Sequence, residues 1–271
     1  MKKKILESYQ KKINEFQKHN KLYYEKNSPS ISDKEFDDIK IEILDLEKKY
    51  SYLKSSKSPS NSVGFKPSKN FKKFKHKEPM LSLSNAFDKE DLINFEKKII
   101  NYLNEKINIE YSVEPKIDGI SASLTYISGK LIHGVSRGDG KEGELITENL
   151  KTIKDIPHQI NNTNLPNEIE IRGEVFIEKK DFETLKEDFA NARNAASGSL
   201  RQKNPDETKK IPLKFIAYTF GYEKGLMANE QSDFLKKLNK WGFKTNPMNK
   251  LISGVKNLMA NYQEIEKERT N

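Results

Sequence analysis

The hydrophobic positions in residues 1–50 begin with helical spacing. Ile5, Tyr9, Ile13 and Phe16 lie three or four residues apart, which places them on one face of a helix. The run Asn-Ser-Pro at 27–29 contains a proline, and a proline cannot continue a helix. We therefore predict a first helix that ends near this run.

A second helix is predicted from Ser32 onward. Glu35 follows Ser32 by three residues, and this pair matches the capping-box pattern of a helix N-terminus. An apolar stripe at helical spacing follows, formed by Phe36, Ile39, Ile43 and Leu46. In the opening turns, Asp33, Phe36 and Asp37 share one face. In a purely structural role, the two aspartates would complement the helix dipole.

The middle of the chain changes to alternating spacing, which is typical of β-strands. We predict a strand that begins at Tyr111 and ends in a tight turn at Gly119. Alternation along this strand places Glu114, Lys116 and Asp118 on one face, so that an ammonium group stands between two carboxylates. The opposite, core-facing side carries Val113 and Ile117.

A hairpin is predicted directly after this strand. The segment 120–127 alternates again, and Ser128-Gly129 is a turn signal that reverses the chain into 131–135. The returning strand leads to Ser-Arg-Gly-Asp-Gly at 136–140, which we expect to lie close to Gly119. Gly138 and Gly140 permit either a plain turn or a backbone concavity for phosphate.

Further elements are expected on both sides of the hairpin. We predict helices at 88–103, 142–150, 180–190, 230–241 and 253–268, strands at 168–177 and 213–220, and a polar loop at 191–202. The strand 168–177 alternates strictly, so Glu170, Arg172 and Glu174 share one face. A purely structural interpretation of Glu170 and Arg172 is a cross-strand ion pair on a solvated face. We expect the core to include Leu235, Leu238, Leu258, Tyr262 and Ile265.

Composition narrows the possible functions. The 271 residues are 34% hydrophobic and 33% charged, which allows a sizeable core and two domains. We expect no membrane partner, because no apolar run approaches the roughly 18 residues of a membrane span and the lysine-rich start lacks a signal-peptide core. The absence of cysteine excludes disulfides and thiolate metal sites and fits a reducing cytosol.

Positive charge points to polyanionic partners. The net charge is +9, and the sequence pI is about 9.2. Between Lys66 and Lys77, six lysines alternate with Phe71 and Phe74, without an acidic residue. This segment fits a nucleic-acid contact, in which lysines neutralise phosphates, and equally a flexible solvated connector.

Lys116 is the strongest candidate for chemistry. An amine in a partly desolvated pocket, close to other cations, loses its proton more readily and becomes a nucleophile, which arginine cannot do. The alternative is that Lys-Ile-Asp-Gly at 116–119 is a surface turn with a salt bridge. A pattern this short arises by chance in roughly one lysine-rich sequence in ten.

Several motifs in order give the chain a resemblance to a known family. Three of them are Lys-Ile-Asp-Gly at 116–119, Arg-Gly-Asp-Gly at 137–140 and Glu-Ile-Arg-Gly-Glu at 170–174. Together they resemble covalent nucleotidyltransferases. More narrowly, the chain resembles the N-terminal part of bacterial NAD-dependent DNA ligase. The further matching segments are 80–87, 143–149 and 191–202.

The resemblance implies a small helical domain that grips the nicotinamide mononucleotide half of NAD. Tyr23, Tyr24, Asp33 and Asp37 match its pattern, and Phe36 stands where the family usually has tyrosine. A phenylalanine there keeps ring stacking and loses a hydroxyl hydrogen bond. From the residues alone, the aromatic side chains are more simply part of a core.

The resemblance also implies an adenylate pocket. It assigns Lys116 as the nucleophile and Asp118 as the group that orients or tunes it. The adenylate site would be formed by Ser82, Leu83, Glu114, Arg137 and Glu174. The family pattern further places four residues near nucleotide or nicked DNA, namely Arg193, Asn194, Ser199 and Arg201. Two departures are Leu145, where the family has aspartate, and Ala192, where it has proline.

We therefore expect an α+β protein with a helical domain and linker at 1–69 and a nucleotidyltransferase domain at 70–271. The second domain would be ATP-grasp-like, mainly antiparallel sheet with helices. The expected cofactors are NAD and Mg²⁺, and the expected partner is nicked double-stranded DNA. We expect a monomer in the bacterial cytoplasm, associated with the nucleoid.

The family's distal motifs are missing from this sequence. In the family, the adenylation domain continues with an Asp-Gly segment followed by a lysine and with a lysine before Phe-Pro. OB-fold, zinc, helix-hairpin-helix and BRCT regions also follow. We therefore expect a shortened chain that lacks full nick sealing. The alternatives are a non-catalytic NAD- or DNA-binding fragment and an ATP-dependent nucleotidyltransferase.

Overall fold

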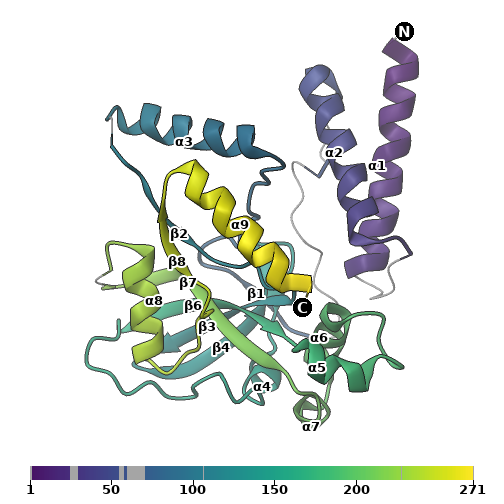
Figure 1. Cartoon of the computed structure of the whole chain (residues 1–271). Helices are drawn as coiled ribbons and strands as arrows, with labels where there is room; N and C mark the ends of the chain where they lie inside the picture. Colours follow the sequence, from purple (N-terminus) through teal and green to yellow (C-terminus); the bar gives the residue numbers. More distant parts are fainter. Residues whose placement is uncertain are drawn as a thin grey trace.

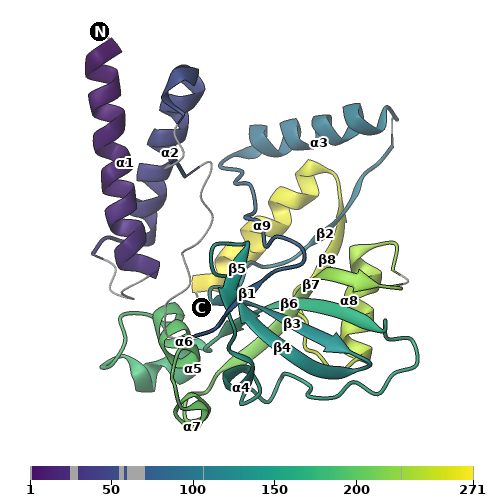
Figure 2. The same cartoon turned by 180° about the vertical axis from the view of Figure 1, so that it is seen from behind.

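The computed structural model describes residues 2–24, 30–54, 58–59, 71–105, 107–226 and 228–270. Its first part is a helical pair, α1 (Lys2–Tyr24) and α2 (Asp33–Lys49), followed by the short 3₁₀ helix η1 (Ser51–Leu53). Figures 1 and 2 show the two helices side by side, next to a larger part that mixes helices and strands. The predicted end of the first helix at 27–29 and most of the predicted linker lie outside the described residues.

The helical pair has its own hydrophobic core. The predicted capping box is present, because the Ser32 hydroxyl accepts from the backbone N–H of Glu35 at 3.3 Å and the Glu35 carboxylate accepts from the Ser32 N–H at 2.8 Å. Tyr9 donates its hydroxyl to Glu47 at 2.7 Å and ties the two helices together. The buried apolar residues of this core are Tyr9, Ile13, Phe16, Ile43 and Leu53.

Antiparallel pairing organises the larger part. Its main sheet has the strand order β4-β3-β6-β7, with β3 at Ile120–Ile127, β4 at Lys130–Ser136, β6 at Glu168–Phe176 and β7 at Lys214–Lys224. Two further pairs are β1 (Lys73–Lys75) with β5 (Glu142–Glu144), and β2 (Glu110–Val113) with β8 (Lys250–Ser253). The predicted hairpin is confirmed, with Ser128 and Gly129 at φ values of 48° and 79° in the turn.

The remaining helices surround these sheets (Figures 1 and 2). They are α3 (Lys89–Leu103), α4 (Thr147–Leu150), α5 (Lys179–Phe182), η2 (Glu183–Leu185), α6 (Ala192–Leu200), α7 (Pro205–Lys209), α8 (Gln231–Lys240) and α9 (Val255–Thr270). The predicted helices at 88–103, 230–241 and 253–268 are thus confirmed within a few residues. The described part contains no helix that is long and apolar enough to cross a bilayer.

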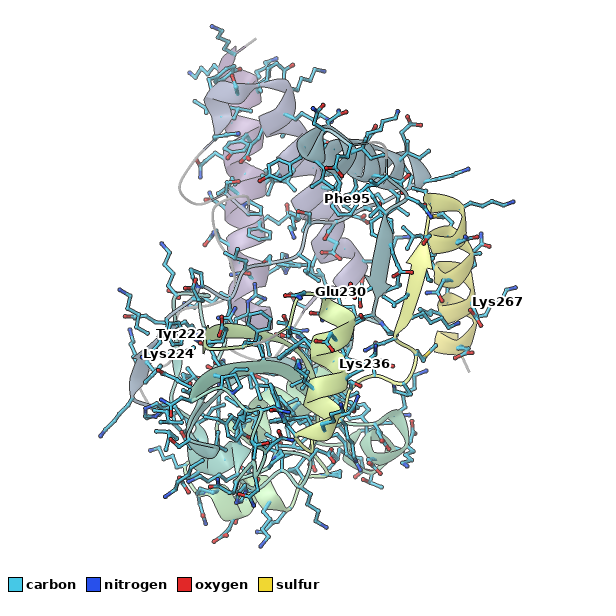
Figure 3. The ribbon with its side chains drawn as sticks, turned by 90° about the vertical axis from the view of Figure 1, so that its left-hand side faces the viewer. Phe95, Tyr222, Lys224, Glu230, Lys236 and Lys267 are labelled. Atoms are coloured by element: carbon cyan, nitrogen blue, oxygen red, sulfur yellow. The ribbon has the colours of Figure 1, made fainter. Side chains whose placement is uncertain are left out.

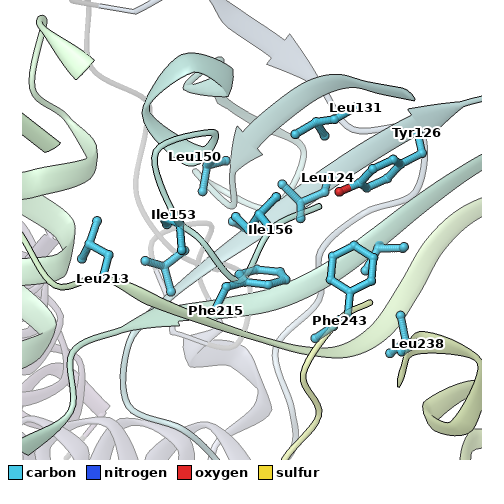
Figure 4. Packing of buried hydrophobic residues seen from close by; sticks show 14 of the residues in the cluster. Leu124, Tyr126, Leu131, Leu150, Ile153, Ile156, Leu213, Phe215, Leu238 and Phe243 are labelled. Carbon is cyan, nitrogen blue, oxygen red and sulfur yellow. The ribbon is translucent and has the colours of Figure 1, made fainter. Parts of the chain in front are cut away.

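One face of the main sheet carries the hydrophobic core (Figure 4). Leu124, Ile171 and Phe215 come from three different strands and are completely buried. Tyr126 joins them and satisfies its hydroxyl by donating to the carbonyl oxygen of Pro157 at 2.6 Å. Burial raises the pKa of this phenol above its ordinary range. The architecture is therefore a mixed helix and antiparallel-sheet domain with an N-terminal helical pair, in agreement with the predicted α+β class.

The opposite face of the same sheet is polar but not solvated. Alternation along β6 is confirmed, and Glu170, Arg172 and Glu174 share this face, each less than 10% exposed. The Arg172 guanidinium donates to Glu170 at 2.8 Å and to the backbone carbonyls of Glu78 and Pro79 at 2.5 and 3.0 Å. The predicted ion pair thus exists, but the prediction of a solvated face is wrong because the segment before residue 80 covers it.

Two sequence predictions near the hairpin are wrong. The strand before the candidate lysine ends at Val113, and the 114–118 segment has no regular secondary structure. Pro115 lacks the N–H that a continued ladder needs. The predicted helix 142–150 is instead strand β5 followed by the short helix α4. A Cβ on Gly143 would lie 1.7 Å from the carbonyl oxygen of Ser136, so this glycine permits a close backbone approach.

Predictions in the second half of the larger part also need correction. The expected polar loop at 191–202 is the helix α6, whose N-terminus is capped by the Asn191 side chain accepting from the Asn194 N–H at 2.8 Å. Its small residues are buried, since Ala195 and Ala196 are fully enclosed, and small side chains let a helix pack closely. The expected helix 180–190 is reduced to α5 and η2. Tyr262, expected in the core, is 58% exposed.

Candidate functional site

The candidate site begins where β2 ends. Glu114 follows the strand and is half-buried, and its Oε1 accepts from Gln231 Nε2 at 2.8 Å and from Ser112 Oγ at 3.3 Å. Lys116 is exposed, so the expected partly desolvated pocket around its amine is not present in this structure. The segment 114–118 therefore holds its carboxylate at the start more firmly than its lysine.

Asp118 contacts a cation from a distant helix. Its Oδ1 accepts from the Arg193 guanidinium at 3.1 Å, and the Asp118 side chain is 69% exposed whereas that of Arg193 is 18% exposed. Arg193 stands in the first turn of α6. The two carboxylates predicted to flank Lys116 therefore have separate partners, Gln231 for Glu114 and Arg193 for Asp118.

Glu174 is the buried carboxylate at the centre of the site. Burial raises the pKa of its carboxyl group above the ordinary value. A hydrogen bond from the Ser121 hydroxyl at 2.8 Å and the positive charges of Arg193, Lys116 and Arg137 oppose this shift. Three cationic side chains from separate parts of the sequence thus act electrostatically on one buried acid.

A glycine brings the lysine segment onto this acid. A Cβ on Gly119 would lie 2.2 Å from the carbonyl oxygen of Val175 and 2.9 Å from the side chain of Glu174. Only glycine allows so close an approach of this segment to β6. Gly119 therefore places the Lys116 segment beside Glu174.

Arg137 connects the hairpin to the segment before α3. Its guanidinium donates to the Met80 carbonyl oxygen at 3.3 Å and to Ser82 Oγ at 2.8 Å. Ser82 is exposed, and Leu83 is 78% exposed. The structure thus brings Ser82 to Arg137 and leaves the Leu83 side chain in contact with solvent.

Three polar residues of the site were not found by sequence reasoning. Ser121 donates to Glu174, and Gln231 donates to Glu114. The third residue is Tyr218 on β7, which lies near Glu174. Burial, and next the negative charge of Glu174, raise the pKa of Tyr218 to about 12. Ser121 and Tyr218 fall at alternating strand positions on the polar face of the main sheet. Alternation marks that face, and no local pattern distinguishes these two from ordinary strand residues.

Residues of the helical pair form a separate group. The Phe36 ring stacks on Phe16, with ring centroids 5.0 Å apart and an interplanar angle of 22°. Asp37 is exposed at the first turns of α2. The side chains of Tyr23, Tyr24 and Asp33, which carry most of the predicted nicotinamide mononucleotide contact, lie outside the described part of the chain.

The four residues that the resemblance places near nucleotide or DNA have different surroundings. Arg193 joins the site through Asp118. Arg201 donates to the almost completely buried carboxylate of Glu144 at 2.9 Å, and its side chain remains 28% exposed. Ser199 is buried and donates to the Ala195 carbonyl oxygen, and Asn194 is also buried.

Comparisons with known proteins identify two family models and several relatives that match this chain. Residues 68–271 match the model of the NAD-dependent DNA ligase adenylation domain, and residues 2–64 match the DNA ligase-like N-terminal NAD+-binding domain. A DNA ligase of Pelagibacter ubique is 67% identical over 96% of this chain. DNA ligases of Parvibaculum lavamentivorans and Rickettsia bellii are 46% and 42% identical over 94% and 99% of it.

These relatives are much longer proteins. The matched region covers 39% of the Pelagibacter ubique ligase, 37% of the Parvibaculum lavamentivorans ligase and 40% of the Rickettsia bellii ligase. The chain thus spans about two fifths of their length. The two family models together match nearly every residue, and on this ground the chain belongs to the NAD-dependent DNA ligase family.

Proposed function

We propose that this chain takes the adenylate group from NAD onto Lys116 and releases nicotinamide mononucleotide. The observation that carries the proposal is the packing of Gly119 against Glu174, which brings the Lys116 segment, with Arg193 bound to its Asp118, to this buried carboxylate. The positive charges of Lys116, Arg193 and Arg137 all act on Glu174 and form one cationic cluster. Cationic groups in such a cluster stabilise the charge that develops on a phosphoryl group in the transition state. Ser82, Leu83 and Glu114 complete the proposed adenylate site.

In the proposed step, the neutral amine of Lys116 attacks the α-phosphorus of the adenylate half of NAD. A nitrogen–phosphorus bond forms while the bond to the bridging pyrophosphate oxygen breaks. Nicotinamide mononucleotide leaves with that oxygen, and the lysine nitrogen gives up its proton to solvent. Asp118, paired with Arg193 at 3.1 Å, orients the amine as a positioning carboxylate.

The helical pair is proposed to hold the nicotinamide mononucleotide half through Tyr23, Tyr24, Asp33, Phe36 and Asp37. The match of residues 2–64 to an NAD+-binding domain supports this assignment. We propose a domain boundary near residue 69, with an ATP-grasp-like nucleotidyltransferase domain from 70 to 271. In the complete enzyme, the adenylate would pass to the 5′ phosphate of nicked DNA, and the 3′ hydroxyl would then close the strand.

Mg²⁺ is the metal expected for this family. The described residues contain no group of three or more histidine, aspartate or glutamate side chains placed to hold a metal ion. Proteins commonly bind Mg²⁺ through one or two carboxylates together with substrate phosphates, and the step proposed for Lys116 is written without assigning ligands to it. We further propose a monomeric bacterial protein of the cytoplasm that associates with the nucleoid.

Intact-mass spectrometry tests the proposal. The chain is incubated with NAD and Mg²⁺, and separately with ATP and Mg²⁺. We expect one added adenylate in the sample with NAD and none in the sample with ATP. Peptide mapping should locate this adenylate on Lys116. Lys116→Ala should abolish it, whereas Lys236→Ala, an exposed lysine on α8 (Figure 3), should retain it. An adduct on the folded Lys116→Ala protein contradicts the assignment, and an adduct from ATP contradicts the cofactor choice.

A second function is favoured by the exposed amine of Lys116. In this alternative, the chain binds NAD or DNA without forming an adduct. Calorimetric titration with NAD and a gel shift with nicked duplex across a salt series distinguish the two, because phosphate contacts weaken steeply with salt. Binding without any adduct in a folded protein supports the non-catalytic alternative.

A further inference from the structure

Gln231, the first residue of α8, connects the two sheets that build the site. Its Nε2 donates to Glu114 Oε1 at 2.8 Å and to the backbone carbonyl oxygen of Tyr218 at 2.6 Å. Glu114 follows β2 of the β2–β8 pair, whereas Tyr218 lies on β7 of the main sheet, which also carries Glu174. Figure 3 shows the neighbouring Glu230 at the end of α8 that faces β2 and β8.

The contacts of Glu114 are asymmetric. Gln231 and Ser112 both donate to Oε1, and no donor among the described residues reaches Oε2. A carboxylate oxygen only accepts hydrogen bonds when the group is ionised. Oε2 is thus oriented by the contacts of Oε1 and remains available to accept from an N–H or O–H group of a ligand.

We propose that Gln231 is a positioning residue, which fixes the carboxylate of Glu114 relative to Glu174 and thereby sets the affinity for the nucleotide. The proposal rests on the adenylate-transfer function proposed above. Without the Gln231 amide, the 114–118 segment loses its side-chain link to β7. The Glu114 side chain is then free to adopt several orientations. Fixing it in one of them when the nucleotide binds costs conformational entropy, and this cost weakens binding.

The first test separates binding from chemistry. The rate of adduct formation is measured across NAD concentrations for the wild type, Gln231→Ala and the control Gln263→Ala, an exposed glutamine on α9. We expect the half-saturating NAD concentration to rise about tenfold in Gln231→Ala, the ratio that corresponds to about 1.4 kcal/mol, with a limiting rate within about twofold of the wild type. A lowered limiting rate with unchanged half-saturation overturns the positioning role.

A nearly isosteric variant guards against simple misfolding. Gln231→Glu keeps the size of the side chain but replaces its donor by a carboxylate that faces Glu114. We expect a rise in half-saturating NAD larger than in Gln231→Ala, in a protein that circular dichroism shows to be folded. A wild-type response in the folded Gln231→Glu protein overturns the proposal.

A double-mutant cycle then tests whether Gln231 acts through Glu114. In the Glu114→Ala background, Gln231→Ala should change the half-saturating concentration less than about twofold, because the linked group is already gone. If Gln231→Ala still raises the half-saturating concentration tenfold in the Glu114→Ala background, Gln231 acts through its hydrogen bond to β7, and the proposal is contradicted.

A measurement without NAD separates this inference from the proposed function. Hydrogen exchange of the backbone amides should become at least about fivefold faster in 112–118 of Gln231→Ala and stay unchanged in the interior of α8. Unchanged exchange in 112–118 overturns the role of Gln231 even if adducts form. Faster exchange with no wild-type adduct instead contradicts adenylate transfer and leaves the Gln231 link intact.

Discussion

The two faces of the main sheet are both buried, but by different means. Leu124, Ile171 and Phe215 fill one face, where any apolar shape of the right volume contributes. The other face buries Arg172 and Glu174, whose charges need specific partners. The same four strands thus provide a tolerant apolar layer and a polar layer in which each partner is individually required.

Arg172 illustrates the demands of the polar face. Its guanidinium lies so close to β7 that a Cβ on Gly221 would come within 2.4 Å of Nη2. It donates to Glu170 and to two backbone carbonyls of the covering segment. That segment leads to Ser82, which accepts from Arg137. A structural arginine thereby supports the edge of the proposed adenylate site.

The largest expected effect comes from the apolar face. Phe215→Ala removes a completely buried ring that packs against Phe243, with ring centroids 6.1 Å apart. We expect the free energy of unfolding to fall by about 4 kcal/mol, through lost transfer energy and an unfilled cavity. Thermal unfolding followed by circular dichroism measures it, with the 53% exposed Phe95 as the control Phe95→Ala. Equal effects of the two variants contradict the description of this core.

A slightly smaller effect is expected from the polar face. Arg172→Met leaves the buried carboxylate of Glu170 and the carbonyl oxygens of Glu78 and Pro79 without their donor. We expect a loss of about 3 kcal/mol in the free energy of unfolding, measured by urea titration. The double variant Glu170→Leu/Arg172→Met removes both charges and should lose less than Arg172→Met alone. A larger loss in the double variant contradicts the interpretation that the unpaired carboxylate causes the damage.

This contrast also explains how far the sequence predicts the structure. Period-two alternation identified Glu170, Arg172 and Glu174 as one face, and motif order drew attention to Lys116 and Arg137. Alternation is a local property, so it does not reveal that a segment 93 and 94 positions away covers the face. Gln231 was missed for the same reason, since its link to Glu114 joins residues 117 positions apart.

The predicted element boundaries are wrong where the same residues are compatible with two local structures. Asn191 and the small residues that follow it form a pattern that predicts a polar loop, although these residues form the buried helix α6. The strand into Lys116 was extended past Pro115, which has no N–H for the ladder. Packing against β6 determines the structure at α6, and the missing N–H determines it at Pro115. Hydrophobic spacing alone predicts neither effect.

A pH-dependent effect sharpens the comparison at Glu174. Its pKa is raised by burial above the ordinary value of 4.5, so the folded state binds the proton more tightly than the unfolded state. Its favourable contribution to stability is therefore complete at low pH and is lost as pH rises through the raised pKa. Glu174→Gln removes this titration, so we expect the variant to gain unfolding temperature relative to the wild type as the pH rises above the ordinary value of 4.5.

The measurement for Glu174 is the difference in unfolding temperature between the two proteins at each pH, because other carboxyl groups cancel in it. The matched control is Glu266→Gln, an exposed glutamate on α9, which should give a flat difference. A difference for Glu174→Gln that falls with rising pH contradicts the sign of the shift. In the same samples, NAD-dependent adduct formation by Glu174→Gln should fall, since the neutral amide no longer balances the three cations.

The smallest expected effect concerns Asn261 on α9, a buried polar side chain that, unlike Arg172, has no hydrogen-bond partner among the described residues. Its side chain is 5% exposed, and neither its amide oxygen nor its nitrogen has a hydrogen-bond partner among the described residues. It lies beside a groove of about 540 Å³ between β8 and α9. Burying an unpaired amide costs free energy, so Asn261→Leu should raise the free energy of unfolding by about 1 kcal/mol.

Asn257→Leu is the matched control on the same helix, and it should lower stability because Asn257 Nδ2 donates to the Ser253 carbonyl oxygen at 2.9 Å. If urea titration shows Asn261→Leu to be as harmful as Asn257→Leu, the Asn261 amide is satisfied in solution and the contrast with Arg172 no longer holds.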